Sequence, residues 1–174
     1  MHRRRFLQVT AVSIAGAGLA GCGDDQAADV PEGGMALGSL DEVRARVEQG
    51  GGAWYVPEAR AYVVEVPAEH QARLADAVDE SLRPGLEAGL LALWQKCPHQ
   101  GCRVPYCEDS GWFECPCHGS RYSTFGELRR GPADRGMSYF PLTVEGTDVK
   151  LLPGDVDGLE DDVLQLPDPG DHCV

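Results

Sequence analysis

The sequence predicts a mainly β protein: a small antiparallel domain of the open-barrel or sandwich type, with a loop-rich excursion and two short helices. Three observations predict this fold. Short runs rich in Trp, Tyr and Val alternate with turn residues, apolar residues recur at helical spacing in only two segments, and Cys, His, Gly and Pro gather between the predicted strands. A chain of 174 residues is long enough for one such domain with tails.

The predicted strands form two hairpins and a central apolar strand. The first hairpin turns at residues 57–60 and the second at Glu145-Gly146. The central strand, GLLALWQ, leads directly into the Cys- and His-rich stretch. The predicted strands cover residues 53–56, 61–66, 89–95, 138–144 and 147–152.

Two short helices are expected, one on each side of the first hairpin. Ser39-Leu-Asp-Glu42 has the pattern of a capping box that opens the first helix, and three glycines from Gly50 end it. Residues 68–80 return to helical spacing. Residues 81–88, which contain a Pro-Gly pair, are predicted to be a loop.

Four segments divide the chain. Residues 1–22 are a targeting and tethering segment, and residues 23–38 are an acidic, glycine-rich linker that we expect to be flexible. Residues 39–154 form the β domain, whose Cys- and His-rich subdomain covers about residues 96–136. Residues 155–174 are an acidic tail, expected to lie against the domain without secondary structure of its own.

The chain is strongly acidic, with 28 Asp and Glu against 15 Lys and Arg and a formal charge of −13. Without Arg3, Arg4 and Arg5 at the N-terminus, 12 basic residues remain and the charge becomes −16. This composition argues against a basic groove for nucleic acid, and an anionic membrane surface would repel the body. The acidity favours solubility or docking to a positively charged protein.

The N-terminus resembles a bacterial twin-arginine (Tat) signal, since Arg3 and Arg4 are followed by Phe6 and Leu7. The apolar run that follows is short for a membrane span and ends in a sequence similar to a lipobox, with Cys22 as the lipidated residue. An uncleaved N-terminal anchor is the alternative. Both interpretations tether the body to the extracytoplasmic face of a bacterial cytoplasmic membrane.

Two Cys- and His-rich clusters stand between the central strand and the second hairpin. Each supplies two thiols and one imidazole, which are good ligands for zinc or for iron in iron–sulfur centres. A zinc site is the simpler alternative, but its four ligands would leave two cysteines without a role. The residues of the two clusters are Cys97, His99, Cys102, Cys115, Cys117 and His118.

The two clusters resemble the Rieske family, with C-x-H-x-G-C followed by C-x-C-H-G-S, over roughly residues 89–152. The resemblance implies a 2Fe–2S cluster with two Cys ligands on one iron and two His ligands on the other. By position, Cys97 and Cys115 bind one iron, and His99 and His118 bind the other. The resemblance also implies a disulfide between the remaining two cysteines, Cys102 and Cys117, that ties the two loops together.

Further residues match the family's surroundings of the cluster. Ser120 and Tyr122 match its pair of hydroxyl donors, which stabilise the reduced cluster and raise its potential. Gly101 and Gly119 complete the two motifs, and Gly131-Pro132-Ala133 matches the proline loop that covers the cluster. Histidine ligation implies a potential of roughly −150 to +300 mV, against about −400 mV for plant-type clusters. Gln100 departs from the aliphatic residue frequent in respiratory members.

Two cysteines, Cys107 and Cys173, remain after the ligands, the disulfide and Cys22 are counted. In an oxidising compartment two spare thiols tend to pair. We therefore predict a second disulfide that fastens the acidic tail to the subdomain, with two free thiols as the alternative.

The resemblance implies a one-electron carrier, a subunit of a quinol:cytochrome c oxidoreductase of the bc type rather than a stand-alone enzyme. His118 or His99 would contact the quinol and take a proton with the electron. The implied partners are a cytochrome b-type membrane subunit, a c-type cytochrome and quinol.

Other functions stay open. One is the Rieske subunit of an exported molybdenum oxidase such as arsenite oxidase, and another is a free, membrane-tethered electron carrier. A soluble Rieske ferredoxin that serves an oxygenase is disfavoured, because that class lacks the cysteines that match Cys102 and Cys117.

Overall fold

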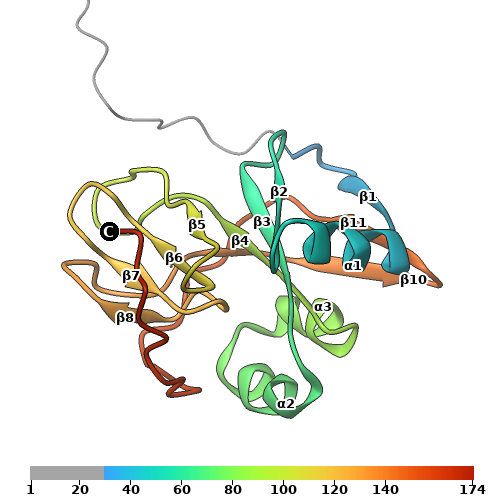
Figure 1. The fold of residues 1–174 in the computed structure, drawn as a ribbon. Coiled ribbons are helices and arrows are strands. Elements are labelled where there is room, and N and C mark those ends of the chain that lie inside the picture. Colours follow the sequence, from blue (N-terminus) through green and yellow to red (C-terminus); the bar gives the residue numbers. More distant parts are fainter. Residues whose placement is uncertain (1–29) are drawn as a thin grey trace, which may run out of the picture.

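The computed structural model describes residues 30–174. The Tat-like segment, Cys22 and the first part of the expected linker lie outside the described residues. Within them, the strands form three antiparallel sheets, ordered β1-β11-β10, β2-β3-β4-β9 and β5-β6-β7-β8. Figure 1 shows the first and third sheets at opposite ends, with the second sheet between them. The mainly antiparallel β-fold with open sheets is confirmed.

The second sheet separates two apolar cores. Its strands are β2 (Ala53–Val56), β3 (Ala61–Glu65), β4 (Leu90–Trp94) and β9 (Tyr139–Phe140). Successive strand residues point to opposite faces, so Leu91 and Leu93 enter one core while Leu90 and Ala92 enter the other. Both faces are covered, which explains why this strand reads as a continuous apolar run in the sequence.

The first sheet contains residues that were expected to belong to a flexible linker. Its strands are β1 (Met35–Ser39), β10 (Leu142–Glu145) and β11 (Asp148–Leu151). Residues 35–38 were expected in a flexible linker, but they pair with β11 across a bulge and bury Leu37. The strand forms because a long-range partner satisfies its backbone groups, a contact that the local glycine-rich pattern does not reveal.

The first helix begins as predicted. In α1 (Leu40–Gln49), Ser39 caps the backbone N–H of Glu42 while the Glu42 carboxylate accepts from the backbone N–H of Ser39, forming the reciprocal capping box. The helix buries Val43 and Val47 against the second core.

Two other segments differ from the prediction. Residues 81–88, expected to be a loop, contain part of the 3₁₀ helix η1 (Glu80–Leu82) and all of α3 (Arg83–Glu87) after α2 (Ala68–Ala77). A proline in the first turn is compatible with a helix, and burial of Leu86 holds this short helix in place. The expected strand 138–144 divides at Pro141 between two sheets, because proline supplies no N–H for the ladder.

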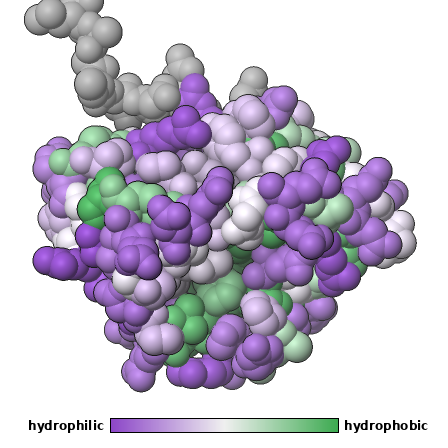
Figure 2. All heavy atoms as spheres, viewed as in Figure 1, coloured by the Kyte–Doolittle hydropathy of each residue, from purple (hydrophilic) through white to green (hydrophobic). Residues whose placement is uncertain are grey.

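The third sheet carries the two Cys- and His-rich loops. Its short strands are β5 (Tyr106–Cys107), β6 (Trp112–Glu114), β7 (Arg121–Tyr122) and β8 (Leu128–Arg130). We call this sheet with residues 96–136 the distal subdomain, and the other two sheets with their helices the base. The face seen in Figure 2 is mostly hydrophilic, with smaller hydrophobic areas. No helix within residues 30–174 is both long and apolar enough to cross a membrane.

Candidate metal centre

Each of the two Cys- and His-rich loops is closed by the same pattern of backbone hydrogen bonds. In the first loop, Cys97 N–H donates to Cys102 O and Gly101 N–H donates to Cys97 O, both at 2.8 Å. In the second loop, Cys115 N–H donates to Ser120 O at 2.8 Å and Gly119 N–H to Cys115 O at 3.0 Å. Donors and acceptors stand at the same offsets in both, so the loops are two copies of one local structure.

This closure explains the glycines of the two motifs. Gly101 and Gly119 have φ of 75° and 73°, in the left-handed region that favours glycine. The shared pattern is Cys-Pro-x-x-Gly, at residues 97–101 and 115–119. This short repeat is the sequence signal that could have predicted the equivalence of the loops. Sequence reasoning had identified the glycines only through the family resemblance.

Cys102 and Cys117 form the disulfide that the resemblance implied. It joins the first loop to the second and removes these two sulfurs from the set of free ligands. The Cys115 sulfur lies within 4.8 Å of both disulfide sulfurs. The bond therefore holds the two loops together directly beside a candidate ligand.

The four candidate ligands lie on the two loops as a pair of cysteines and a pair of histidines. Cys97 and Cys115 are the free cysteines of residues 30–174, and their exposed fractions are 2% and 1%. The rings of His99 and His118 meet edge to face with their centroids 4.9 Å apart. His99 is half-buried and His118 is exposed. The thiols thus lie inside, and the imidazoles lie toward the surface.

Burial, with an added effect of the neighbouring Cys97, raises the pKa of the Cys115 thiol. Two adjacent buried thiolates are unfavourable unless a cation compensates their charge, and a metal centre supplies that cation. Two sulfurs and two imidazoles are the donor set of a 2Fe–2S centre of mixed ligation. The residues present therefore fit such a group.

A tyrosine hydroxyl points at one of these sulfurs. Tyr122 Oη lies 3.2 Å from Cys97 Sγ, and the tyrosine is fully buried. Burial, and then the neighbouring Cys97, raise the pKa of Tyr122, so the phenol stays protonated and can donate to the sulfur. The hydroxyl of Ser120, also buried, accepts from Ala133 N–H at 3.3 Å. That contact leaves the Ser120 hydrogen available to donate elsewhere.

A third loop packs against the second. Gly131 has φ of 110°, and a Cβ added there would lie only 2.4 Å from Ser120 Cα. The glycine therefore allows Gly131-Pro132-Ala133 to approach the backbone of the second cysteine loop closely. Pro132 is exposed on this loop.

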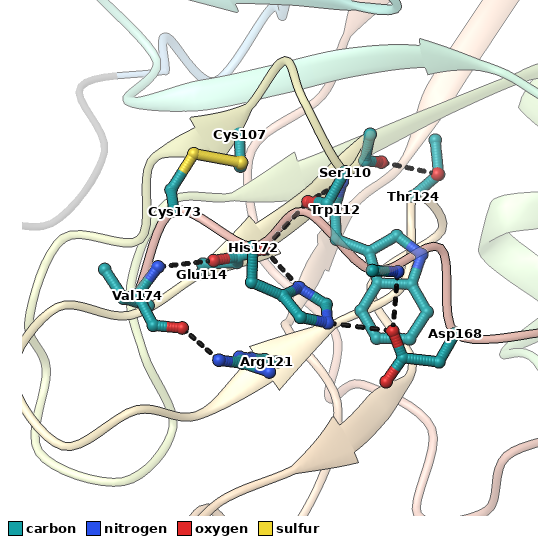
Figure 3. A network of polar contacts seen from close by, with 12 residues as sticks. Cys107, Ser110, Trp112, Glu114, Arg121, Thr124, Asp168, His172, Cys173 and Val174 are labelled. Atoms are coloured by element: carbon teal, nitrogen blue, oxygen red, sulfur yellow. Dashed lines mark hydrogen bonds and ion pairs between the residues drawn. A yellow bond between two sulfur atoms is a disulfide. The ribbon is translucent and has the colours of Figure 1, made fainter.

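The acidic tail also reaches the distal subdomain, where Cys107 and Cys173 form the predicted second disulfide. Figure 3 shows this bond next to a polar network that includes Glu114 and His172. Sequence reasoning gave neither residue a role. Nothing local identifies Glu114 as special, because its partners come from the distant end of the chain.

Comparison with known proteins gives a family match over half of the chain. The model of the Rieske [2Fe-2S] domain matches residues 55–141. The cytochrome b6-f complex iron-sulfur subunit of Synechococcus sp. (strain JA-3-3Ab) is 44% identical over 57 residues, which are 33% of this chain and 33% of that protein. Its counterpart from Gloeobacter violaceus is 42% identical over 57 residues, 33% of this chain and 31% of that protein.

The chain thus spans about a third of the length of the curated relatives it matches. Among solved structures, a cyanobacterial plasma-membrane Rieske protein from Synechocystis PCC 6803 is similar, with a TM-score of 0.47 and 22% identity. That similarity covers 68% of this chain and 99% of the other.

Proposed function

Because this chain belongs to the family of Rieske [2Fe-2S] domain proteins, we propose that it is a one-electron carrier that serves a quinol-oxidising complex of the cytochrome bc type. Its cofactor is a 2Fe–2S cluster. Cys97 and Cys115 bind one iron and His99 and His118 bind the other. When bound, the cluster supplies one-electron oxidation and reduction at roughly −150 to +300 mV.

One observation carries the proposal. The two thiols are buried, whereas the two imidazoles meet each other and the His118 ring is exposed. A partner at this surface can reach an imidazole but not the sulfurs. The exposed His118 ring is therefore the group suited to accept a hydrogen bond from a quinol hydroxyl and to take its proton.

The surrounding residues favour a high potential. The Tyr122 phenol donates toward the Cys97 sulfur, which favours the more negative, reduced state. The buried Ser120 hydroxyl, which interacts with Tyr122, is the second candidate donor of this region. Gly131-Pro132-Ala133 packs closely on the second loop.

The partners follow from the relatives. The curated relatives reported above are iron–sulfur subunits of cytochrome b6-f complexes. By analogy, we propose a cytochrome b-type membrane subunit and a c-type cytochrome as partners, with the N-terminal segment as a tether at the extracytoplasmic face. The net charge of −13 suits a partner whose docking surface is positive.

A redox titration of the holoprotein at several pH values, followed by EPR, tests the proposal. A high potential that falls with pH above neutrality is expected, because reduction of a centre with imidazole ligands is coupled to the uptake of a proton. A low potential that does not change with pH would rule out quinol oxidation.

Purification from membranes tests the partner separately. Cytochrome b is expected to co-purify with this chain. Co-purification of a molybdopterin subunit, or of no other protein, would contradict the assignment to a bc-type complex.

A further inference from the structure

The acidic tail, residues 155–174, is fastened to the rest of the molecule along its length. It carries seven carboxylates and no Lys or Arg. Arg129 binds both the Asp162 carboxylate and the main-chain oxygen of Leu166, each at 2.6 Å. Figure 1 shows the tail running beside β7 and β8 and ending in the distal subdomain. We call residues 155–174 the C-terminal strap.

The last residue of the strap binds both ends of the second cysteine loop. Glu114 and Arg121 pair in register on β6 and β7 and flank residues 115–120. Val174 N–H donates to Glu114 Oε2 at 2.9 Å, and its main-chain oxygen accepts from the Arg121 guanidinium (Figure 3). The strap thus joins the two points at which this loop leaves the sheet.

Glu114 depends on the strap for most of its partners. Its side chain is fully buried and accepts from Ser110 Oγ at 2.7 Å. His172 Nδ1 lies 2.8 Å from Glu114 Oε1, and His172 Nε2 lies 2.8 Å from Asp168 Oδ1. Without the strap, a buried carboxylate directly before Cys115 would lose two of its three partners. Such a loss is costly for a charged group.

A second buried carboxylate is completed in the same way. Glu127, also fully buried, accepts from Ser123 Oγ at 3.2 Å and from the backbone N–H of Leu164 in the strap at 2.8 Å. Leu164 is itself buried in the core that the distal subdomain shares with the base. The strap therefore satisfies both buried carboxylates of the distal subdomain.

A covalent link keeps the strap in place. The Cys107–Cys173 disulfide joins β5 to the strap across a sequence separation of 66 residues. Because the bond lies at Cys173, it limits how far the end of the strap can detach, and it also removes conformational entropy from the unfolded chain. The two sulfurs lie within 4.8 Å of a Glu114 carboxylate oxygen, but the disulfide uses both, so they are not free to bind a metal.

We infer that the C-terminal strap is a positioning element of the metal centre, which holds residues 115–120 in their cluster-binding shape through Glu114 and Arg121. The inference rests on the proposed function, since it takes Cys115 and His118 to be ligands. His172 contacts Glu114, and Val174 contacts both Glu114 and Arg121. Through these contacts they position the two ends of residues 115–120.

The test compares variants at the end of the strap in the full-length holoprotein. For His172→Ala we expect the cluster to be released to a chelator about tenfold faster, equivalent to about 1.4 kcal/mol. We also expect a changed EPR line shape and faster hydrogen exchange at the backbone amides of Cys115 and Gly119. His172→Gln, whose amide can still donate to Glu114, should restore all three properties toward wild type. Cys107→Ser/Cys173→Ser should shift them in the same direction as His172→Ala.

Two milder variants keep the test decisive if His172→Ala does not load a cluster. Asp168→Asn removes only the outer partner of His172 and should give a smaller shift in the same direction. Asp157→Asn breaks the exposed ion pair with Arg135 near the start of the strap, and it should change nothing. Wild-type release, EPR and exchange in the His172, Asp168 and disulfide variants would overturn the inference. A low, pH-independent potential with these shifts present would instead overturn the proposed function alone.

Discussion

The base and the distal subdomain of this chain are stabilised by different means. The base has strands of up to five residues, and its central sheet is covered by apolar side chains on both faces. The distal subdomain has strands of two or three residues. Its 96–136 segment also contains five of the buried polar side chains of residues 30–174, namely Ser110, Glu114, Ser120, Ser123 and Glu127.

Both disulfides of the described chain hold the distal subdomain. Short strands and cysteine loops offer less apolar surface for burial than the longer strands of the base, so the distal subdomain needs additional constraints. Cross-links and hydrogen-bonded buried carboxylates supply those constraints, while the base is ordered mainly by apolar burial. Changes in the two regions should therefore have separable effects.

The largest effect is expected from removing a proposed ligand. Cys115→Ser should abolish cluster binding, because a serine hydroxyl is a poor replacement for a thiolate ligand at a buried iron site. Iron content and the EPR signal should fall to background. The far-UV circular dichroism of the base should remain, and a variant that kept its iron would remove Cys115 from the ligand set. Glu108→Ala, an exposed change in the same subdomain, is a suitable control.

A core truncation in the base should affect stability but not the centre. Leu90 is fully buried on β4, in the core that faces the first sheet. Leu90→Ala should lower the free energy of unfolding by about 2–5 kcal/mol, from lost burial and the cavity left behind. Denaturant titration measures the loss. The EPR spectrum of the folded variant should match that of the wild type, and a changed spectrum would show that the two regions are coupled.

Loss of the disulfide between the cysteine loops should act on the distal subdomain alone. Cys102→Ser/Cys117→Ser opens a loop with a sequence separation of 15, for which the chain-entropy estimate is about 3 kcal/mol. We expect the cluster to be lost at a lower temperature in a visible-absorption melt. The melting of the base, followed by far-UV circular dichroism, should stay near that of the wild type. A shared downward shift of both transitions would contradict the separation of the two regions.

Tyr122→Phe should lower the midpoint potential without releasing the cluster. It removes the hydrogen bond to Cys97 that favours the reduced state. About 59 mV corresponds to each tenfold change in the equilibrium for one electron. The pKa of Tyr122 is raised above its ordinary value of 10.0, so the phenol stays protonated below that pH. The difference between variant and wild type should therefore be constant from neutral pH to about pH 9 in a redox titration.

The smallest effect is expected at the helix cap of the base. Ser39→Ala removes the cap of α1 and should cost about 1 kcal/mol in denaturant unfolding. The hydrogen bonds from Ser39 hold the pKa of Glu42 below its ordinary value of 4.5. The stability that the ionised Glu42 carboxylate contributes is therefore present above pH 4.5 and is lost as the pH falls through the lowered pKa of the folded state. Ser39→Asp, which can still cap the helix, should retain most of the stability.

Much of the fold could be predicted because its signals are local. The first hairpin, the central strand and the capping box at Ser39 each depend on residues a few positions apart. Prediction failed at β1 and α3. The glycine-rich residues before Ser39 become a strand only by pairing with β11, more than 100 residues away. The Pro-Gly loop becomes a short helix because Leu86 is buried by tertiary packing.

The sequence by itself determined the candidate centre: the paired Cys-Pro-x-x-Gly loops, their cysteines and histidines, and the cysteines left to pair. Those features can be seen in the sequence because they depend on residue type and short spacing. The backbone closure of each loop requires a glycine at a fixed distance from its cysteine. Only the tertiary structure decided the environment of Glu114, whose partner His172 is 58 residues away. A buried carboxylate and a histidine in an acidic tail have no local signature. Their meeting depends on the path of the whole chain.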